Sequence, residues 1–337
     1  MPPALRHPAR RRPRRADALL FHGWRALGPL ARALPLSSAY ALSNALMDAV
    51  YAAWPDGRRA MRDNLRTVLG TNDHQLLDHW GQRQLRRYGE YLVDSLRLEA
   101  LTPQDCLRAL EAEPDAWPRL RELYGREPII FALMHFGNWD VGGGAFTAAC
   151  GRSSVIVESL GNPRMDRAVQ QARDGLGMTP VGIDGGILPA RRALRHGGTV
   201  AVLIDRPLPP AEPGVDLTFC GRSCRLPEGF ARLALASGAR VFPFAVLRLS
   251  SRHFRFRALI DLDFTYPVSG DRGEDVRALT QGVLDVHESW VRRWPDQWYQ
   301  FRPFFDGPSV APAPFPRALP KDDDTLVIAA DKTGLRK

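Results

Sequence analysis

Residues 128–150 read PIIFALMHFGNWDVGGGAFTAAC and combine an apolar run, a short turn and the start of a helical pattern. The run 128–136 has the length and composition of a strand that is buried on both faces. Asn138 then provides a side chain that favours the start of a helix. We therefore predict a strand–turn–helix unit, with His135 at the carboxyl end of the strand and Asp140 in the first turn of the helix.

Strand and helix patterns alternate regularly along the rest of this region. The expected strands cover 153–159, 178–183, 199–205, 215–221 and 240–249, followed by a half-exposed antiparallel strand at 253–264. The expected helices cover 163–177, 186–198, 227–239 and 273–294. This alternation predicts an α/β fold with a central, mostly parallel sheet flanked by helices.

The region before the sheet has a different pattern. Two apolar segments, 17–34 and 37–54, have helical spacing and few charges, and neither has the roughly twenty apolar residues that a spanning helix needs. We expect an amphipathic helical hairpin that associates with a membrane surface; a hairpin packed on the protein's own core is the alternative. Further amphipathic helices with basic faces are expected at 56–70 and 82–101.

Charge and composition complete the outline. The chain has 337 residues and a net charge of +9, and its first fifteen residues contain six arginines and no acid. Such an arm attracts an anionic membrane or nucleic acid; a solvated tail without a dedicated partner is the alternative. The expected organisation is a disordered basic arm at 1–16, a helical, membrane-associating region at 17–110, an α/β domain at 111–305 and a loosely ordered tail at 306–337.

The four cysteines show no paired spacing, which is typical of a reducing, cytosolic environment and makes a zinc site unexpected. The N-terminus also lacks the pattern of a secretion signal.

The turn at His135 is a candidate for chemistry because ligand sites of α/β sheets gather at the carboxyl ends of strands. Across a strand–turn–helix junction Asp140 could fold back, orient the imidazole and stabilise its positive charge. The turn contains no serine or cysteine, so His135 would act directly on a substrate hydroxyl or on water. The local pattern fits equally well a structural histidine, with Asp140 favouring the helix N-terminus.

HFGNWD at 135–140 resembles the HX4(D/E) motif of glycerolipid acyltransferases. The resemblance is most specific for the bacterial family that contains lipid A acyltransferases and phosphatidylinositol mannoside acyltransferases. It extends over RRYGEYLVDSLRL at 86–98, VIVESLGNPRMDR at 155–167, ARDGLGM at 172–178, VAVLIDRPL at 200–208, and the stretch VDLTFCGRSCRLPEGFARLALASGARVFPF at 215–244. Asp140 and Glu158 resemble the mannoside branch, in which the motif also ends in aspartate.

The resemblance implies a membrane-associated O-acyltransferase that moves a fatty acyl chain from acyl-CoA or acyl carrier protein to a membrane glycolipid or lysolipid. It implies no acyl-enzyme, no resident cofactor and no metal. His135 would be the general base and Asp140 its orienting acid, with backbone N–H groups at Gly137–Asn138 or the Asn138 side chain binding the oxyanion. The implied substrate-binding residues are Asn138, Glu158, Arg173, Asp205 and Arg206.

For several of these residues, a purely structural role is the alternative. Arg173 could be a helix-surface arginine, and Asp205 and Arg206 could form an ion pair, with each other or with a neighbouring residue, that shapes a loop. The DRP sequence at 205–207 replaces the DRD of related proteins, so a role for a second acid there is not carried over.

The expected location is peripheral, on the cytoplasmic face of the plasma (inner) membrane, with an anionic lipid surface as partner and no nucleic acid. Two other functions stay open: a thioesterase in which His135 activates water, and a non-catalytic membrane- or nucleic-acid-binding protein.

Overall fold

A computed structural model describes residues 23, 26–158, 162–182, 188–209 and 212–307. The predicted basic arm at 1–16 lies outside the described residues, as does the predicted tail beyond residue 307. The structure thus covers most of the α/β region and most of the helical region before it.

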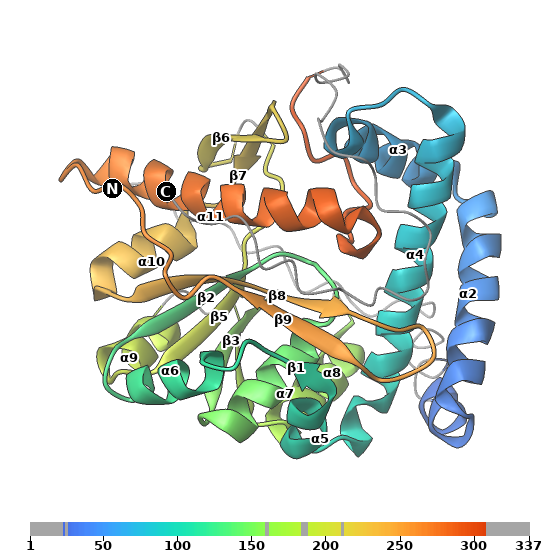
Figure 1. Ribbon diagram of the computed structural model, residues 1–337, viewed down its shortest axis with the longest axis horizontal. Coiled ribbons are helices and arrows are strands. Elements are labelled where there is room, and N and C mark those ends of the chain that lie inside the picture. The colour runs from blue at the N-terminus through green and yellow to red at the C-terminus, as the bar shows by residue number, and fades with distance from the viewer. Residues whose placement is uncertain (1–22, 24–25, 159–161, 183–187, 210–211, 308–337) are drawn as a thin grey trace.

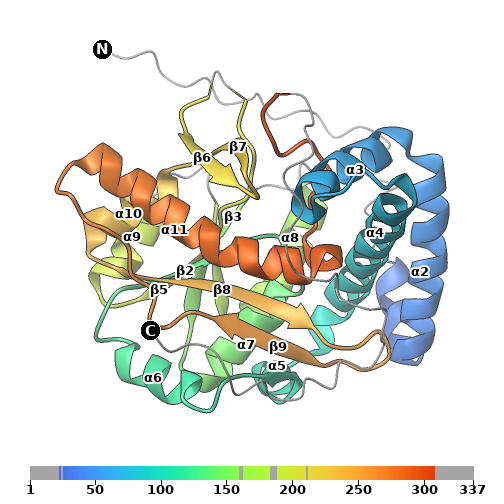
Figure 2. The same ribbon diagram turned by 45° about the horizontal axis from the view of Figure 1, so that its top comes forward.

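The N-terminal part of the described chain is helical. After a helical stretch at 26–33 come α2 (Leu36–Ala53), α3 (Pro55–Leu69) and α4 (His74–Arg97). Asp73 starts α4 by accepting hydrogen bonds from the N–H groups of Gln75 and Leu76. Helix α2 lies along α4 at one end of the molecule (Figures 1 and 2). Within the described ranges, no helix combines the length and apolarity that a membrane crossing requires.

The remaining chain forms a seven-stranded sheet. Its strands are β1 (Leu110–Glu111), β2 (Ile129–Leu133), β3 (Ser153–Val157), β4 (Met178–Gly182), β5 (Thr199–Leu203), β8 (Arg240–Arg248) and β9 (Phe256–Ile260). The order across the sheet is β1-β9-β8-β2-β5-β3-β4. Every neighbouring pair is parallel except β8 and β9, which run antiparallel as the alternation in 253–264 predicted. The predicted α/β class with a mostly parallel sheet is confirmed.

Helices cover both faces of this sheet (Figure 1). One face carries α5 (Pro103–Ala109), α6 (Ala116–Leu123), α7 (Trp139–Ala149) and α8 (Pro163–Gly175). The other carries α9 (Leu188–Arg195), α10 (Gly229–Ser237) and α11 (Arg272–Arg293), with a hairpin of β6 (Val215–Phe219) and β7 (Arg222–Leu226) packed on α11. The sheet therefore separates two apolar cores.

Four short elements were not predicted: β1, β7, α5 and α6. Strand β1 has two residues, and α5 and α6 have seven and eight, which is too short for a periodic pattern to develop. The residues of β7 read RSCRL, and their polar side chains do not give the apolar pattern that predicts a strand. The predicted domain boundaries at 110 and 305 remain predictions.

Candidate active site

His135 lies two residues beyond the end of β2 and lines a cavity of about 510 Å³. Successive residues of this segment pack alternately into the two cores, with Ile130, Ala132 and Met134 on the α11 side and Ile129, Phe131 and Leu133 on the α7 side. His135 continues the second series and lines the cavity on the α7 side. Its side chain remains 41% exposed, so a substrate can reach it.

Asp205 is the carboxylate that contacts the His135 ring. Leu133 and Leu203 are partners in the parallel register of β2 and β5. His135 and Asp205 lie two residues beyond these partners, so both side chains emerge on the same side at the same edge of the sheet. Asp205 Oδ1 is 2.8 Å from His135 Nδ1, and Asp205 Oδ2 accepts the His135 backbone N–H at 3.0 Å.

The segment 298–300 fixes this pair from the other side. The indole N–H of Trp298 donates to Asp205 Oδ2 at 3.0 Å, and the Gln300 amide donates to the Asp205 carbonyl at 3.2 Å. The Tyr299 N–H donates to the His135 carbonyl at 2.7 Å. Residues 298–300 were not predicted to belong to the site, since nothing in their local pattern places them beside β2 and β5.

His135 and Asp205 each shift the pKa of the other towards the charged form. Burial lowers the pKa of His135, but the Asp205 carboxylate raises it by more, so the pKa lies above its ordinary value. Burial raises the pKa of Asp205, but the charge and hydrogen bonds of His135 and the Trp298 donor lower it by more, and the net shift is downward. Asp205 therefore stays ionised and accepts the Nδ1 proton of His135, which leaves Nε2 free to accept a proton.

The expected contact between Asp140 and His135 is wrong. Asn138 does cap α7, and Asp140 does lie in its first turn as predicted. However, the ring of Trp139 packs edge-on against His135, with centroids 5.4 Å apart. Asp140 follows about 100° further round the helix. It accepts hydrogen bonds from Arg173 Nε at 2.7 Å and from the Tyr91 hydroxyl at 3.0 Å.

The proposed oxyanion donors near Asn138 are also occupied by other partners. The Gly137 N–H donates to the Gln297 carbonyl at 2.9 Å, and the Asn138 N–H donates to the Val246 carbonyl at 3.0 Å. The Asn138 amide donates to Asp94 at 2.8 Å, and this side chain is 1% exposed. The geometry therefore does not support substrate contact by Asn138.

The other predicted residues line the cavity in pairs. Arg206 and Glu158 form an ion pair at 2.9 Å, and both side chains are about half exposed at its mouth. Arg173, which is largely buried, lines the wall through its pair with Asp140. Arg206 thus forms an ion pair with a neighbouring residue, as the structural alternative expected. Asp205 instead contacts the histidine directly.

The interior of the cavity is apolar. Its buried wall comes from α6, α7 and the sheet and includes Ala116, Leu120, Phe131, Phe146, Phe244 and Ala258. Aromatic rings of Tyr88, Tyr91, Trp139, Tyr299 and Phe301 line the side near His135. The cavity therefore joins a titratable pair at its mouth to an apolar slot, a combination suited to a substrate with a polar reacting group and a hydrocarbon chain.

Within the described part of the chain, no cluster of three or more His, Cys, Asp or Glu side chains has the arrangement of a metal site.

Comparison with known proteins shows the family of the chain. The sequence profile of the bacterial lipid A biosynthesis acyltransferases matches residues 6–306. The phosphatidylinositol mannoside acyltransferase of Mycolicibacterium smegmatis is 28% identical over 287 residues, which cover 83% of this chain and 88% of that protein. The protein of that name from Mycobacterium tuberculosis strain H37Rv is 29% identical over 287 residues, covering 83% of this chain and 85% of its own. The matched family is the one that the motifs predicted.

Proposed function

The chain belongs to the bacterial lipid A biosynthesis acyltransferase family, and on that premise we propose that it transfers a fatty acyl chain from a thioester to a hydroxyl of a membrane glycolipid. The donor is acyl-CoA or acyl carrier protein. The similarity to two proteins named phosphatidylinositol mannoside acyltransferases supports a glycolipid acceptor over a simple lysolipid.

The observation that carries this proposal is the His135–Asp205 pair at the mouth of an apolar cavity. His135 Nε2 removes the proton from the acceptor hydroxyl as that oxygen attacks the thioester carbonyl. The carbon–sulfur bond then breaks, and the imidazolium returns the proton to the leaving thiolate. Asp205 orients the ring and stabilises its positive charge during the step, which is the role first expected of Asp140.

We assign the remaining cavity residues to binding either the acyl donor or the acceptor. The apolar slot accommodates the acyl chain, whose burial supplies binding energy away from the reacting carbonyl. Glu158 and Arg206, exposed at the mouth, contact the polar head of the acceptor or the phosphates of the donor. Arg173 lines the wall beside them and holds Asp140, and we assign it a positioning role in the site.

The proposed membrane surface lies on the N-terminal helices. Leu42 and Leu46 on α2 are 61% and 58% exposed, and Leu27 and Leu30 on the preceding helical stretch are each 49% exposed. Trp54, at the end of α2, contacts Phe301 of the cavity lining at a centroid distance of 6.3 Å. Trp54 and Phe301 therefore connect the end of α2 to the cavity lining, and we propose that lipid enters from this side. The basic arm would add attraction to an anionic leaflet.

The test compares wild type with His135→Ala, using radiolabelled palmitoyl-CoA and vesicles that contain phosphatidylinositol mannoside or a membrane lipid extract. We expect labelled glycolipid with wild type and a loss of at least about 100-fold with His135→Ala, because general base catalysis contributes at that level. Equal product from both proteins would contradict the assignment of His135.

The same assay separates the alternative functions. Free labelled fatty acid in place of labelled lipid would identify a thioesterase. If neither product formed with either donor, CoA or carrier protein, a non-catalytic membrane protein would be favoured instead.

A further inference from the structure

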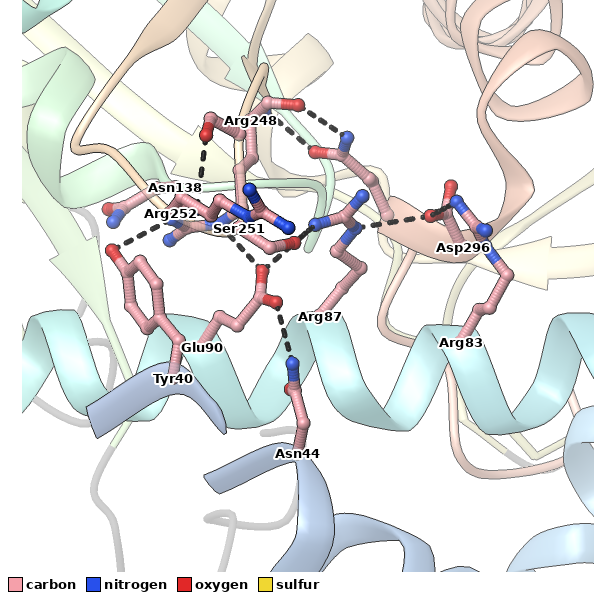
Figure 3. A network of polar contacts seen from close by, with 12 residues as sticks. Tyr40, Asn44, Arg83, Arg87, Glu90, Asn138, Arg248, Ser251, Arg252 and Asp296 are labelled. Atoms are coloured by element: carbon pink, nitrogen blue, oxygen red, sulfur yellow. Dashed lines mark hydrogen bonds and ion pairs between the residues drawn. The ribbon is translucent and has the colours of Figure 1, made fainter. Parts of the chain in front are cut away.

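A cluster of six charged side chains lies next to the active site, between α4, β8 and the turn at Pro295–Gln297 (Figure 3). It balances three arginines against three acids: Arg83, Arg87, Arg248, Glu90, Asp94 and Asp296. Arg248, Glu90 and Asp94 are at most about 3% exposed. Burying charges is costly even when they are paired, and apolar replacements are often as stable. Stability alone is therefore a weak reason for this cluster.

Asp94 connects the cluster to the active site. Its carboxylate accepts three donors from three different parts of the fold: the Tyr40 hydroxyl of α2 at 2.6 Å, the Asn138 amide at 2.8 Å, and the Arg248 guanidinium of β8. Figure 3 labels Tyr40, Arg248 and Asn138 within this network. The amide of Asn138 thus binds the Asp94 carboxylate, which Tyr40 and Arg248 hold in place.

Asn138 belongs to residues 135–138, which we call the catalytic loop. Its side-chain oxygen accepts the Val141 N–H at 3.2 Å and caps α7, while its amide is free to bind Asp94. The loop backbone has separate attachments: Gly137 and Asn138 donate to Gln297 and Val246. Loss of the Asp94 bond would therefore loosen the loop without detaching it from the sheet.

We propose that Asp94 is a positioning residue for the acyl transfer, holding the catalytic loop through Asn138 so that His135 and Trp139 keep the geometry the reaction needs; the proposal rests on the function proposed above. Arg248 provides the charge that holds the Asp94 carboxylate in place. Small displacements of a catalytic base cost large factors in rate, so this one hydrogen bond matters more to turnover than to folding.

The test uses two serine substitutions that remove the same kind of bond from the same cluster. Asn138→Ser keeps an oxygen that can cap α7 but cannot reach Asp94. Asn44→Ser is the matched control, because the Asn44 amide donates to Glu90 at 3.1 Å from α2 and does not contact the catalytic loop. With palmitoyl-CoA and phosphatidylinositol mannoside vesicles, we expect kcat to fall about 10-fold or more in Asn138→Ser and less than about twofold in Asn44→Ser.

Two further readouts distinguish positioning from general destabilisation. The KM for palmitoyl-CoA and the pH at half-maximal rate should stay near wild type in Asn138→Ser, since the substitution removes neither a residue that lines the cavity nor a member of the His135–Asp205 pair. Hydrogen exchange of a peptide covering 129–141, which needs no turnover, should be faster in Asn138→Ser and unchanged in Asn44→Ser. Unchanged exchange in Asn138→Ser, or equal kcat in the two variants, would overturn the proposal. If wild type itself gave no product, the proposed function would fail with this acceptor. The exchange comparison would still test whether the Asn138–Asp94 bond holds the catalytic loop.

A reciprocal exchange gives a rescue experiment. Asn138→Asp alone places a second carboxylate against Asp94 and should inactivate the enzyme. Adding Asp94→Asn restores an amide–carboxylate bond with the roles reversed and should recover part of kcat. A double variant no more active than the single one would count against the proposal.

Discussion

At the scale of single residues, the site depends on which carboxylate holds His135. Asp205 is buried and contacts Nδ1, whereas Asp140 contacts Arg173 and Tyr91. The acid of the recognised sequence motif is thus a support for the cavity wall, and the acid that contacts the histidine comes from another strand. Two substitutions separate these roles.

Asp205→Asn should both reduce activity and move its pH dependence. The rate needs neutral His135 and therefore rises with pH through the raised pKa of that group. Without the Asp205 charge this pKa falls, so the acid limb of the profile shifts to lower pH, while the plateau drops about 100-fold or more because the ring loses its orienting acceptor. NMR titration of the labelled histidine measures the pKa directly. Asp140→Asn is the control and should leave the acid limb near that of wild type; the reverse pattern would restore Asp140 as the orienting acid.

Asp140→Ala should instead act mainly on stability. It leaves the Arg173 guanidinium largely buried without its partner at 2.7 Å, and breaking such a pair costs about 3 kcal/mol. Urea unfolding of Asp140→Ala, Arg173→Ala and the double variant measures this cost. We expect the double variant to lose clearly less than the sum of the single losses, since the second change removes an already unpaired group. Strict additivity would argue that the pair contributes little.

At the scale of elements, the decisive feature is the turn between β2 and α7. Gly137 has φ of +61°, and a Cβ atom there would lie 1.7 Å from the Val246 carbonyl oxygen of β8. The turn can therefore pass against β8 only with glycine at this position. This approach places Asn138 within reach of Asp94 and Trp139 beside His135.

Gly137→Ala should displace this turn and abolish activity. Gly125 offers a matched control, because its φ is +76° but no atom lies within 4 Å of an added Cβ. Gly125→Ala should cost only the backbone term of about 1–2 kcal/mol and stay active. Thermal unfolding and the transfer assay together check both variants. A Gly137→Ala protein as stable and active as Gly125→Ala would contradict the tight approach of the turn to β8.

At the scale of the whole molecule, the exposed leucines of α2 lie at the opposite end from α9 (Figure 1). Leu42→Glu with Leu46→Glu should weaken binding to anionic vesicles about 10-fold or more, since two apolar contacts with lipid are replaced by repulsive charges. Leu188→Glu on α9 changes an equally exposed leucine and should bind like wild type. Vesicle sedimentation measures both. Equal binding by all three proteins would place the membrane surface elsewhere.

Much of this protein follows from local sequence. Alternating patterns determined the α/β class, the antiparallel strand at 256–260 and the start of α7 at Asn138, because strand and helix periods and capping side chains act over a few residues. The position of His135 at a strand end followed in the same way. The motifs also identified the family.

The partners of His135 were decided only by the tertiary structure. Asp205 meets the histidine because β5 pairs with β2 in a parallel register that brings Leu133 opposite Leu203. Neither strand carries a local signal for that pairing. Trp298 reaches Asp205 from the segment that follows Pro295–Gln297, and Asp94 reaches Asn138 from α4. Sequence alone therefore placed His135 at the end of a strand, while long-range packing decided which acid contacts it, since register and helix docking depend on contacts between segments that are distant in sequence.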